Sequence, residues 1–394
     1  MQRALLLLLL GCRAPSAPAA TPPADEIELV ESWPIETPLD HSDVRDAERV
    51  WPEMIDRATK SLVFEEFYAS DVEDARSESP LAPTLAAIGR AVKRGVRVRF
   101  LADQVMAPKY PATLDVLRAA GVEVRILDCK PRFGGVQHAK LFVVDEDEAF
   151  VGSQNFDWRA LRHIQEIGVR VRSRAVAGGL LDVFETDWAL ADASTPSTTR
   201  VRAHPARPAA ARFALYGSPA AWLPDPSIGD LDRLVALLDG AARSIELQVL
   251  TYSTTMRDKS TFTTLDDALR RAAARGVRVR LVVSSWADKE DNHALRALAS
   301  VPNVEVRVMT IPPWSGGEIP FARVTHAKFL LLDRASAWIG TSNWEGDYFL
   351  KSRNVAIVTD APNVVAPLSR IFDGDWAFSA ALAAPPSSSD PARP

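Results

Sequence analysis

The sequence contains a long internal repeat, which limits the possible folds of the chain more than any other feature. The segment R-G-V-R-V-R at Arg94–Arg99 returns 181 residues later at Arg275–Arg280, and H-A-K at His138–Lys140 returns 188 residues later at His326–Lys328. Two further pairs follow in the same order, G-V-E-V-R with N-V-E-V-R at Gly121–Arg125 and Asn303–Arg307, and F-E-T-D-W with F-D-G-D-W at Phe184–Trp188 and Phe372–Trp376. Four collinear matches predict a tandem duplication of one structural unit.

The repeat and the composition between its copies predict the domain boundaries. The two units are expected to span residues 26–191 and 213–380. A stretch rich in Pro, Ala, Ser and Thr, residues 192–212, is expected to link them, and residues 381–394 are expected to form a disordered tail.

The N-terminal segment has the pattern of a targeting signal. One Arg precedes the apolar run Ala4–Leu10, which is too short to cross a bilayer and ends in Gly11 and Cys12. The ending L-L-G-C resembles a bacterial lipoprotein signal, which implies lipidation of Cys12 and a membrane anchor in the bacterial cell envelope. The alternative is a secretory signal cleaved near Ala19–Ala20. Residues 1–25 are therefore predicted to be a signal followed by a Pro/Ala tether.

Helix and strand patterns alternate within each unit. Strands are predicted at Ser61–Tyr68 and Ser244–Thr251, and amphipathic helices at Leu85–Lys93 and Leu265–Arg275. Further helices are predicted at Thr113–Ala120 and Asn292–Ser300. This alternation predicts α/β units with a largely parallel, helix-covered sheet. The arginines of the V-R-V-R strands form either a rail for phosphate or, as we expect, a face that is solvated or paired with neighbouring acids.

Each unit carries the same set of polar residues. The first copy has His138, Lys140, Asp145, Gly152, Ser153 and Asn155, and the second has His326, Lys328, Asp333, Gly340, Ser342 and Asn343. Because strand side chains alternate between faces, His and Lys are expected to point together toward the substrate, and Asp to the opposite face with a structural role. Each Gly is expected to permit close backbone approach, which would place the following hydroxyl and Asn beside the histidine.

Two copies of this set suit phosphodiester cleavage without a metal. Lysines and amide donors would stabilise the negative charge on the phosphoryl oxygens in the transition state. One imidazole would attack phosphorus, and the other would protonate the leaving alkoxide and then activate water. Lysines beside the histidines oppose a bound divalent cation, and the sequence has no H-E-x-x-H motif and no clustered Cys and His. We therefore expect neither a metal nor another cofactor.

At these residues the chain resembles the phospholipase D superfamily, whose members build one active site from two H-K-D motifs. The resemblance implies two α/β/α sandwich halves related by a pseudo-two-fold axis. A narrower likeness to the type 3 and type 4 phospholipase D-like proteins lies at Gly152–Arg159, Ile319–Val324 and Ile339–Phe349. That branch is associated with 5′-to-3′ exonuclease action on single-stranded DNA and RNA, and with phospholipid transphosphatidylation.

The resemblance also implies roles for single residues. It makes His138 the nucleophile that forms a covalent phosphohistidine and His326 the general acid. Lys140, Lys328, Asn155 and Asn343 would bind phosphate, with Ser153 and Ser342 as further donors. Glu166, eleven residues after Asn155, matches the family acid that orients a catalytic histidine. The second half has Asn354 at this place, so Glu345 or Asp347 would have to substitute as the partner of the other histidine.

Aromatic residues and further histidines stand near the motifs. Trp158 and Trp344 are candidates for stacking nucleobases, with packing between the halves or acyl-chain binding as the alternatives. His163 is expected at the surface rather than in the site. His41, His204 and His293 are expected to have no catalytic role.

The predicted function is a metal-independent phosphodiesterase acting on single-stranded nucleic acid. The alternative is a phospholipase D or transphosphatidylase, which a lipid anchor would hold at the membrane that contains its substrate. Two intact motifs argue against a non-catalytic binding module. With 46 Lys and Arg against 51 Asp and Glu, the net charge of −5 provides no overall positive field, so a local patch would have to hold any polyanion. No obligate protein partner is implied.

Overall fold

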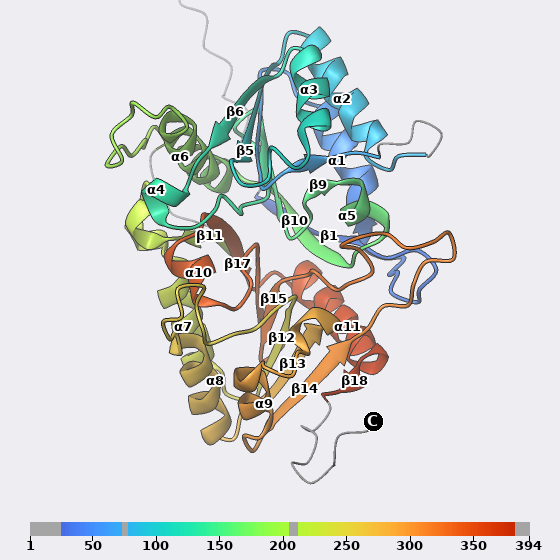
Figure 1. The fold of residues 1–394 in the computed structure, drawn as a ribbon, viewed down its shortest axis with the longest axis vertical. Coiled ribbons are helices and arrows are strands. Elements are labelled where there is room, and N and C mark those ends of the chain that lie inside the picture. The colour runs from blue at the N-terminus through green and yellow to red at the C-terminus, as the bar shows by residue number, and fades with distance from the viewer. Residues whose placement is uncertain (1–24, 73–77, 205–211, 383–394) are drawn as a thin grey trace, which may run out of the picture.

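The computed structural model describes residues 25–72, 78–204 and 212–382 and shows two α/β halves, one above the other in Figure 1. Each half is built around an eight-stranded sheet with helices packed on it, so the predicted α/β duplication is confirmed. Cys12 and nearly all of the predicted signal, tether and tail lie outside the described residues. No helix of the described ranges is both long and apolar enough to cross a bilayer.

The first half has the strand order β2-β1-β10-β8-β7-β3-β5-β6 in its main sheet. Its strands are β1 (Glu26–Ser32), β2 (Arg45–Asp46), β3 (Ser61–Glu66), β4 (Ala69–Ser70), β5 (Arg97–Asp103), β6 (Glu123–Leu127), β7 (Leu141–Val144), β8 (Glu148–Gly152), β9 (Phe156–Asp157) and β10 (Glu166–Arg172). Its helices are α1 (Ala47–Asp56), α2 (Ala82–Lys93), α3 (Pro111–Ala119), α4 (Lys130–Phe133), α5 (Trp158–Arg162) and α6 (Arg174–Leu190).

The second half has the order β11-β17-β16-β15-β12-β13-β14-β18. Its strands are β11 (Phe213–Ser218), β12 (Ser244–Val249), β13 (Arg278–Ser284), β14 (Val304–Met309), β15 (Phe329–Leu332), β16 (Ser336–Gly340), β17 (Asn354–Thr359) and β18 (Ala380–Ala381). Its α-helices are α7 (Asp230–Gly240), α8 (Thr264–Ala274), α9 (His293–Ala299), α10 (Gly346–Leu350) and α11 (Pro362–Phe378). Short 3₁₀ helices are η1 (Ala220–Trp222), η2 (Pro226–Ile228) and η3 (Ser285–Ala287).

Both sheets are mixed, so the prediction of a largely parallel sheet was wrong. The strands joined by helical crossovers are parallel, β3 with β5 and β6 in the first half and β12 with β13 and β14 in the second. The strands that follow each H-A-K segment form antiparallel hairpins instead, β7 with β8 and β15 with β16. Short turns join these strands, and a parallel pair would have required a long crossover.

The two halves share a central apolar layer. Residues of this layer come from both sheets, with Val169 of β10 and Ile357 of β17 among them. The long helices α6 and α11 lie beside it, and each also contacts a strand of the opposite half, α6 with β11 and α11 with β1. Separating the halves would therefore expose apolar surface, which stabilises their association.

The arginines of the repeated V-R-V-R strands are paired with acids. Arg99 Nη2 lies 2.5 Å from Glu185 Oε1 on α6, and Arg280 pairs with the buried Glu246. This agrees with the expectation of pairing and leaves these side chains engaged rather than free to bind a phosphate chain.

Candidate active site

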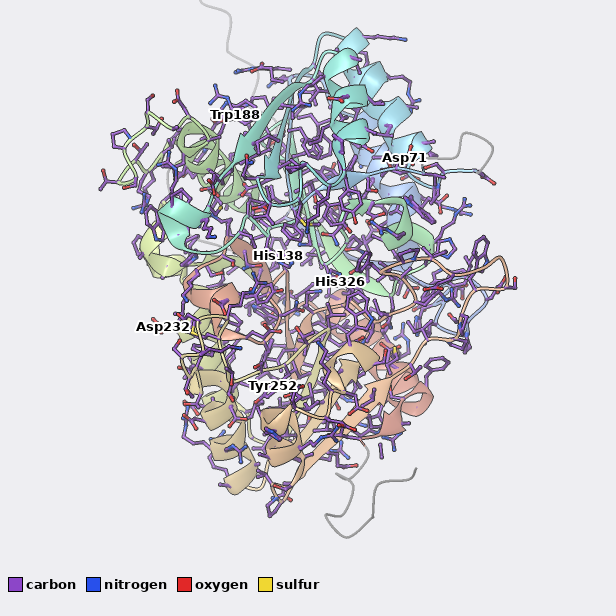
Figure 2. All side chains as sticks on the ribbon, in the orientation of Figure 1. Asp71, His138, Trp188, Asp232, Tyr252 and His326 are labelled. Atoms are coloured by element: carbon purple, nitrogen blue, oxygen red, sulfur yellow. The ribbon has the colours of Figure 1, made fainter. Side chains whose placement is uncertain are left out.

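His138 and His326 stand on extended segments directly before β7 and β15, and each segment is held by the opposite half. The backbone N–H of His138 donates to Arg353 O at 2.9 Å, and that of His326 donates to Gln165 O at 2.8 Å. Figure 2 shows both histidines where the two halves meet. The backbone pairing between halves therefore fixes the position of each histidine relative to the other.

Both imidazoles line one cavity of about 310 Å³. The first half contributes Phe67, Tyr68, Met106, Lys109, Tyr110, His138, Asn155 and Ile164 to the lining, and the second contributes Leu250, Trp286, Phe321, Val324, His326, Asn343 and Tyr348. The lining is largely aromatic and apolar, with a few polar groups and no carboxylate. A site of this composition suits an uncharged or anionic ligand.

The two histidines have different partners. His326 Nδ1 lies 2.9 Å from both carboxylate oxygens of Glu166, which is fully buried. His138 Nδ1 lies 3.0 Å from Oδ1 of Asn354, the residue that takes the place of Glu166 in the second half. The expectation that Glu345 or Asp347 would substitute was wrong, because Glu345 accepts from Thr251 Oγ1 and Asp347 accepts from the backbone N–H of Arg257.

The surroundings of Asn354 fix the tautomer of His138. The Nδ2 group of Asn354 donates to Tyr348 O at 2.8 Å and to Ser352 O at 3.2 Å, so its Oδ1 must face the imidazole. An oxygen acceptor at that position requires a proton on His138 Nδ1. The Nε2 atom of neutral His138 therefore carries the lone pair.

Burial lowers the pKa of both histidines. The pKa of His138 lies well below its usual value of 6.5 because of burial and then the positive charges of Lys140 and Lys328. Burial lowers the pKa of His326 to about 4, and the negative charge of Glu166 acts in the opposite direction. Two rings also enclose His138, since Phe67 and Tyr348 each have their centroid 4.9 Å from it, edge to face. His138 is thus kept neutral, and His326 has the partner that stabilises an imidazolium.

The two lysines of the motifs lie behind the histidines rather than in the cavity wall. Lys140 and Lys328 are fully buried, and each Nζ donates to the carbonyl oxygen of the histidine two residues earlier, at 2.7 Å for Lys140. Burial lowers the pKa of Lys140 to about 7, against the opposing charges of Glu66 and Glu166. Burial also lowers the pKa of Lys328 well below its usual value, and each lysine, when protonated, places its charge against the backbone of its histidine.

Some of the polar residues that follow Gly152 and Gly340 line the cavity, and others lie in the core. Asn155 and Asn343 line the cavity, as the spacing predicts. The hydroxyls of Ser153 and Ser342 do not line it, so the expectation that these two serines bind phosphate there was wrong, whereas the hydroxyl of Thr341, directly after Gly340, donates at 2.8 Å to Asn354 Oδ1, the partner of His138. Ser153 Oγ donates to Ile167 O and accepts from Ile167 N, so this hydroxyl is bound to the backbone of β10. Ser342 is fully buried and does not line the cavity.

The glycines permit close backbone packing. A Cβ atom on Gly152 would lie 2.9 Å from Gly168 Cα on β10, and one on Gly340 would lie 2.8 Å from Ala356 Cβ on β17. Any larger residue at either position would push the strand, and the asparagine that follows it, out of place.

The aspartates of the two motifs bind backbone at the far ends of their strands. Asp145 accepts from the N–H groups of Thr59, Lys60 and Ser61, at 2.7 to 2.9 Å. Asp333 accepts in the same way from residues 242–244. Each carboxylate thus ties the β7–β8 or β15–β16 turn to the strand beside it.

Trp344, Trp158 and His163 all lie outside the cavity wall. Trp344 is buried in the core of the second half and Trp158 packs against the core of the first, so neither is placed to stack a base in the cavity, and each packs within its own half rather than between the halves. His163 is buried rather than exposed, between the rings of Trp158 and Trp314 at 5.4 and 5.0 Å. Consecutive side chains of an extended chain point in opposite directions. Because Asn343 points into the cavity, Trp344 points into the core.

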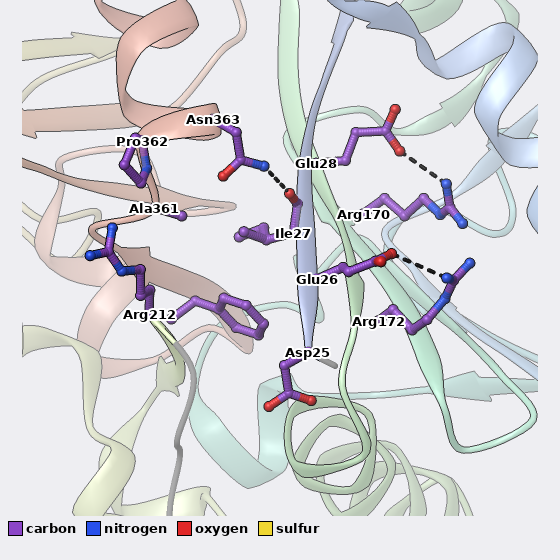
Figure 3. A pocket seen from close by; sticks show the side chains of 11 residues that line it. Asp25, Glu26, Ile27, Glu28, Arg170, Arg172, Arg212, Ala361, Pro362 and Asn363 are labelled. Atoms are coloured by element: carbon purple, nitrogen blue, oxygen red, sulfur yellow. Dashed lines mark hydrogen bonds and ion pairs between the residues drawn. The ribbon is translucent and has the colours of Figure 1, made fainter. Parts of the chain in front are cut away.

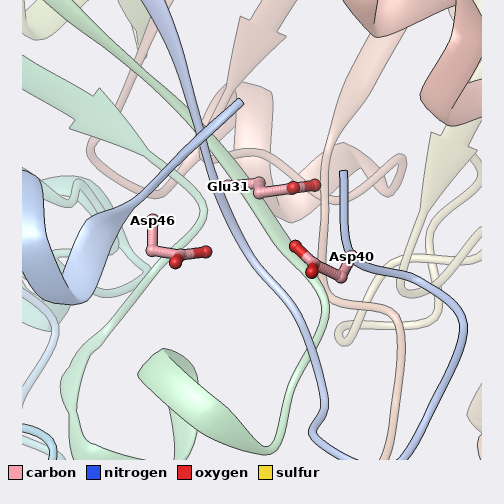
Figure 4. A group of neighbouring side chains, drawn as sticks. All are labelled: Glu31, Asp40 and Asp46. Atoms are coloured by element: carbon pink, nitrogen blue, oxygen red, sulfur yellow. The ribbon is translucent and has the colours of Figure 1, made fainter. Parts of the chain in front are cut away.

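Two other features of the molecule lie apart from this site. A larger cavity of about 780 Å³ lies where β1 meets the second half, and two of the three arginines drawn in Figure 3 pair with acids there, Arg170 with Glu28 and Arg172 with Glu26. Figure 4 shows the one group of three or more potential metal ligands from His, Cys, Asp and Glu in the described ranges whose ligand atoms lie within 4.8 Å of one another, Glu31, Asp40 and Asp46. Glu31 is already bound to His41 at 3.0 Å, and none of the three lines the cavity of the histidines.

Sequence reasoning missed most of the side chains that line the cavity, Phe67, Lys109, Trp286 and Phe321 among them. The repeat contains a signal for one of them. Trp286 stands at the position after the second V-R-V-R strand that Val105 occupies after the first, so only the second copy has an aromatic residue there. Phe321 lies in the segment I-P-F-A-R-V, but nothing in that segment indicates that its ring faces a site.

Comparison with known proteins agrees with this geometry. The sequence matches the family described as "Cardiolipin synthase, PLD-like domain" at residues 52–188 and 234–376, once in each half. It is 31% identical to mouse 5′-3′ exonuclease PLD4, over 91% of this chain and 79% of that protein, and 30% identical to phospholipase D Z of Dictyostelium discoideum, over 89% of each. The solved structure of phosphatidylserine synthase from Haemophilus influenzae has the same fold, with a TM-score of 0.60 and 13% identity over 85% of each chain. The chain belongs to the phospholipase D-like family.

Proposed function

We propose that this protein is a metal-independent phosphodiesterase that cleaves single-stranded nucleic acid through a covalent phosphohistidine. The observation that carries the proposal is the pair of histidines in one cavity with different Nδ1 partners, Asn354 for His138 and Glu166 for His326. This difference supports opposite roles for two residues that the repeat makes equivalent.

In the first step, the Nε2 lone pair of His138 attacks phosphorus. An N–P bond forms, the P–O bond to the leaving alkoxide breaks, and the proton of His326 Nε2 moves to the alkoxide oxygen. Glu166 stabilises the protonated His326 before this transfer. The positive charges of Lys140 and Lys328 and the amides of Asn155 and Asn343 oppose the negative charge that develops on the phosphoryl oxygens.

In the second step, water attacks the phosphohistidine. His326, now neutral, takes a proton from the water, an O–P bond forms, and the N–P bond breaks to release neutral His138. The two steps return both histidines to their starting states, so the cycle needs no external acid, base or metal.

The substrate class is supported by the lining of the cavity and by the relatives. Aromatic side chains with a lysine among them suit single-stranded nucleic acid, because bases stack on rings in a sequence-tolerant manner. Relatives named 5′-3′ exonuclease match nine-tenths of this chain.

The proposal is tested with labelled single-stranded oligonucleotides that carry a free or a blocked 5′ end, incubated in EDTA. Stepwise shortening from the free 5′ end, together with a phosphoryl adduct on His138 trapped by alkaline quench and mass spectrometry, is the expected result. Hydrolysis of phosphatidylcholine vesicles in place of oligonucleotides would assign the phospholipase reaction instead. Binding of either substrate without turnover would contradict both.

We also propose that Cys12 is acylated and holds the protein at the membrane of the bacterial cell envelope. The support is the L-L-G-C pattern alone, since residue 12 lies outside the described ranges. Mass spectrometry of the N-terminal peptide from membrane and soluble fractions tests it. A Cys12→Ala protein that still fractionates with membranes would contradict it.

A further inference from the structure

Two aromatic side chains that no step of the proposed reaction uses stand exposed at the cavity that holds the histidines. Trp286 on η3 is 38% exposed and Phe321 is 67% exposed, and both line the cavity. Their rings are nearly perpendicular, with an interplanar angle of 84° and centroids 6.4 Å apart. They form the two faces of a corner, which we call the Trp286–Phe321 corner.

The backbone on both sides of Phe321 is firmly held, although the side chain is exposed. Phe321 has a φ angle of +61°, a left-handed conformation that costs free energy for a bulky residue. Arg159 Nη1 donates to Pro320 O at 3.1 Å, and the buried Arg323 donates to Pro312 O at 2.7 Å and to Ile35 O at 2.8 Å. Anchors from both halves thus hold an apolar ring outward in a strained conformation, an arrangement that packing alone does not require.

The repeat shows that Trp286 occupies a special position. The backbone N–H of Trp286 donates to Ser284 Oγ at 3.1 Å. At the matching point of the first half, the backbone N–H of Val105 donates to Asp103 Oδ1 at 2.8 Å. Both loops thus end their strands in the same way, and Val105 is also exposed. Only the second half carries an aromatic ring there, and only that ring lines the cavity.

The first half provides a cation and a hydroxyl in the lining of the same cavity. Lys109 and Tyr110 follow β5, and Lys109 has no acidic partner among the residues that the structure describes. Tyr110 is held by stacking on Tyr68, with centroids 4.8 Å apart and an interplanar angle of 25°. The cavity therefore combines flat aromatic surfaces with a free ammonium group.

We propose that the Trp286–Phe321 corner stacks the base of the 5′-terminal nucleotide, the one next to the scissile phosphate, and that Lys109 binds the backbone phosphate. The inference rests on the proposed function and specifies how that site holds its substrate. A nucleobase can lay one flat face on one ring and its edge against the other, and its neighbouring negative charge matches Lys109. An acyl chain has neither a flat face to stack on a ring nor a charge for the ammonium group.

The test compares oligonucleotides with a normal or an abasic 5′-terminal nucleotide and measures kcat/KM in EDTA. Because base stacking on one ring contributes roughly 1–3 kcal/mol, removing the base should lower kcat/KM of the unaltered protein roughly 5- to 150-fold. Trp286→Ala should lower kcat/KM on the normal oligonucleotide by the same factor. On the abasic oligonucleotide, kcat/KM of Trp286→Ala should be almost the same as that of the unaltered protein. Phe321→Ala should behave alike, and Trp286→Phe should retain most of the discrimination.

Val105→Ala is the matched control, because it removes an exposed apolar side chain from the equivalent loop outside the cavity lining. It should keep the discrimination of the unaltered protein. Thermal unfolding midpoints, and hydrolysis of methyl p-nitrophenyl phosphate, which has no base, establish that each variant is folded and that its histidines are intact.

The outcomes separate this inference from the proposed function. If the unaltered protein cleaves both oligonucleotides and Trp286→Ala discriminates between them equally well, the corner does not stack the base, and the proposed function stands. If the unaltered protein cleaves no oligonucleotide, the proposed function itself fails. If Trp286→Ala and Phe321→Ala impair only the hydrolysis of phosphatidylcholine vesicles, the corner binds an acyl chain and the inference is overturned.

Discussion

Glu166→Gln provides the sharpest test of how the two histidines divide the reaction. Glutamine has nearly the same size as glutamate and can still accept from His326 Nδ1, but it carries no charge. Both carboxylate oxygens of Glu166 lie 2.9 Å from that nitrogen, and the residue is fully buried. The substitution therefore removes one charge-assisted hydrogen bond and leaves a neutral one in its place.

The magnitude follows from the difference between these two bonds. A hydrogen bond to a charged group contributes about 1.5–3 kcal/mol, and a neutral one about 0.5–1.5 kcal/mol. A loss of about 1–2 kcal/mol in the stabilisation of protonated His326 lowers kcat/KM roughly 5- to 30-fold on an oligonucleotide, whose alkoxide leaving group needs the proton. This is less than the roughly 10²–10⁴-fold that a general acid contributes as a whole.

The assay compares this substrate with a p-nitrophenyl phosphodiester, whose leaving group needs no proton. There kcat/KM of Glu166→Gln should stay close to that of the unaltered protein. Glu65→Gln is the matched control, because Glu65 is equally buried, its pKa is raised well above the usual value by burial, and its Oε1 accepts from Gln137 Nε2 rather than from a histidine. Equal losses of Glu166→Gln on both substrates would refute the reasoning, because Glu166 would then act on attack by His138.

Three further predictions follow from the site and its supports. Since His326 must be protonated and its pKa is about 4, kcat/KM on an oligonucleotide should fall as pH rises above about 4. On the activated ester, kcat/KM should stay level once His138 is neutral. A rise of kcat/KM toward alkaline pH on the oligonucleotide would contradict the assignment. Activity should persist in EDTA, because no carboxylate lines the cavity, and its loss with recovery on adding a divalent ion would show that a metal takes part. Arg353→Met should lower the free energy of unfolding in urea by about 3–5 kcal/mol, because it leaves the buried Asp187 unpaired, whereas Arg90→Met, in an exposed pair with Asp56, should cost no more than about 1 kcal/mol.

The repeat made the local structure predictable. Helices expected at Leu85–Lys93 and Leu265–Arg275 are observed at Ala82–Lys93 and Thr264–Ala274, because their apolar periodicity and the Arg-Gly that ends them are local signals. The positions of the histidines and asparagines in the cavity wall were predictable for the same reason, whereas the lysines, predicted to face the substrate with the histidines, lie behind them. His138 and His326 reach one cavity because equivalent segments of a duplicated unit meet across its axis.

Features that depend on contacts between the halves could not be predicted. His138 and Asn354 are 216 residues apart, and no local pattern indicates that one half supplies the partner of the other half's histidine. The misplacement of Trp344 has a related cause. Its closeness to Asn343 in the sequence suggested a shared site, but neighbouring side chains point in opposite directions, and the core of the second half receives the ring.

Divergence between the two copies explains how a symmetric fold can perform an asymmetric reaction. Two identical halves would place two identical histidines at the phosphate, and neither would be predisposed to attack or to protonate. Here Glu166 in one copy corresponds to Asn354 in the other, and Ala160 corresponds to Tyr348, whose ring packs edge-on against His138. Both differences act in the same direction, since the amide of Asn354 stabilises protonated His138 less than a carboxylate would, burial favours neutral His138, and the carboxylate of Glu166 favours protonated His326. Duplication thus supplies the common geometry, and in the proposed mechanism a few substitutions around it distinguish the histidine that attacks from the one that donates the proton.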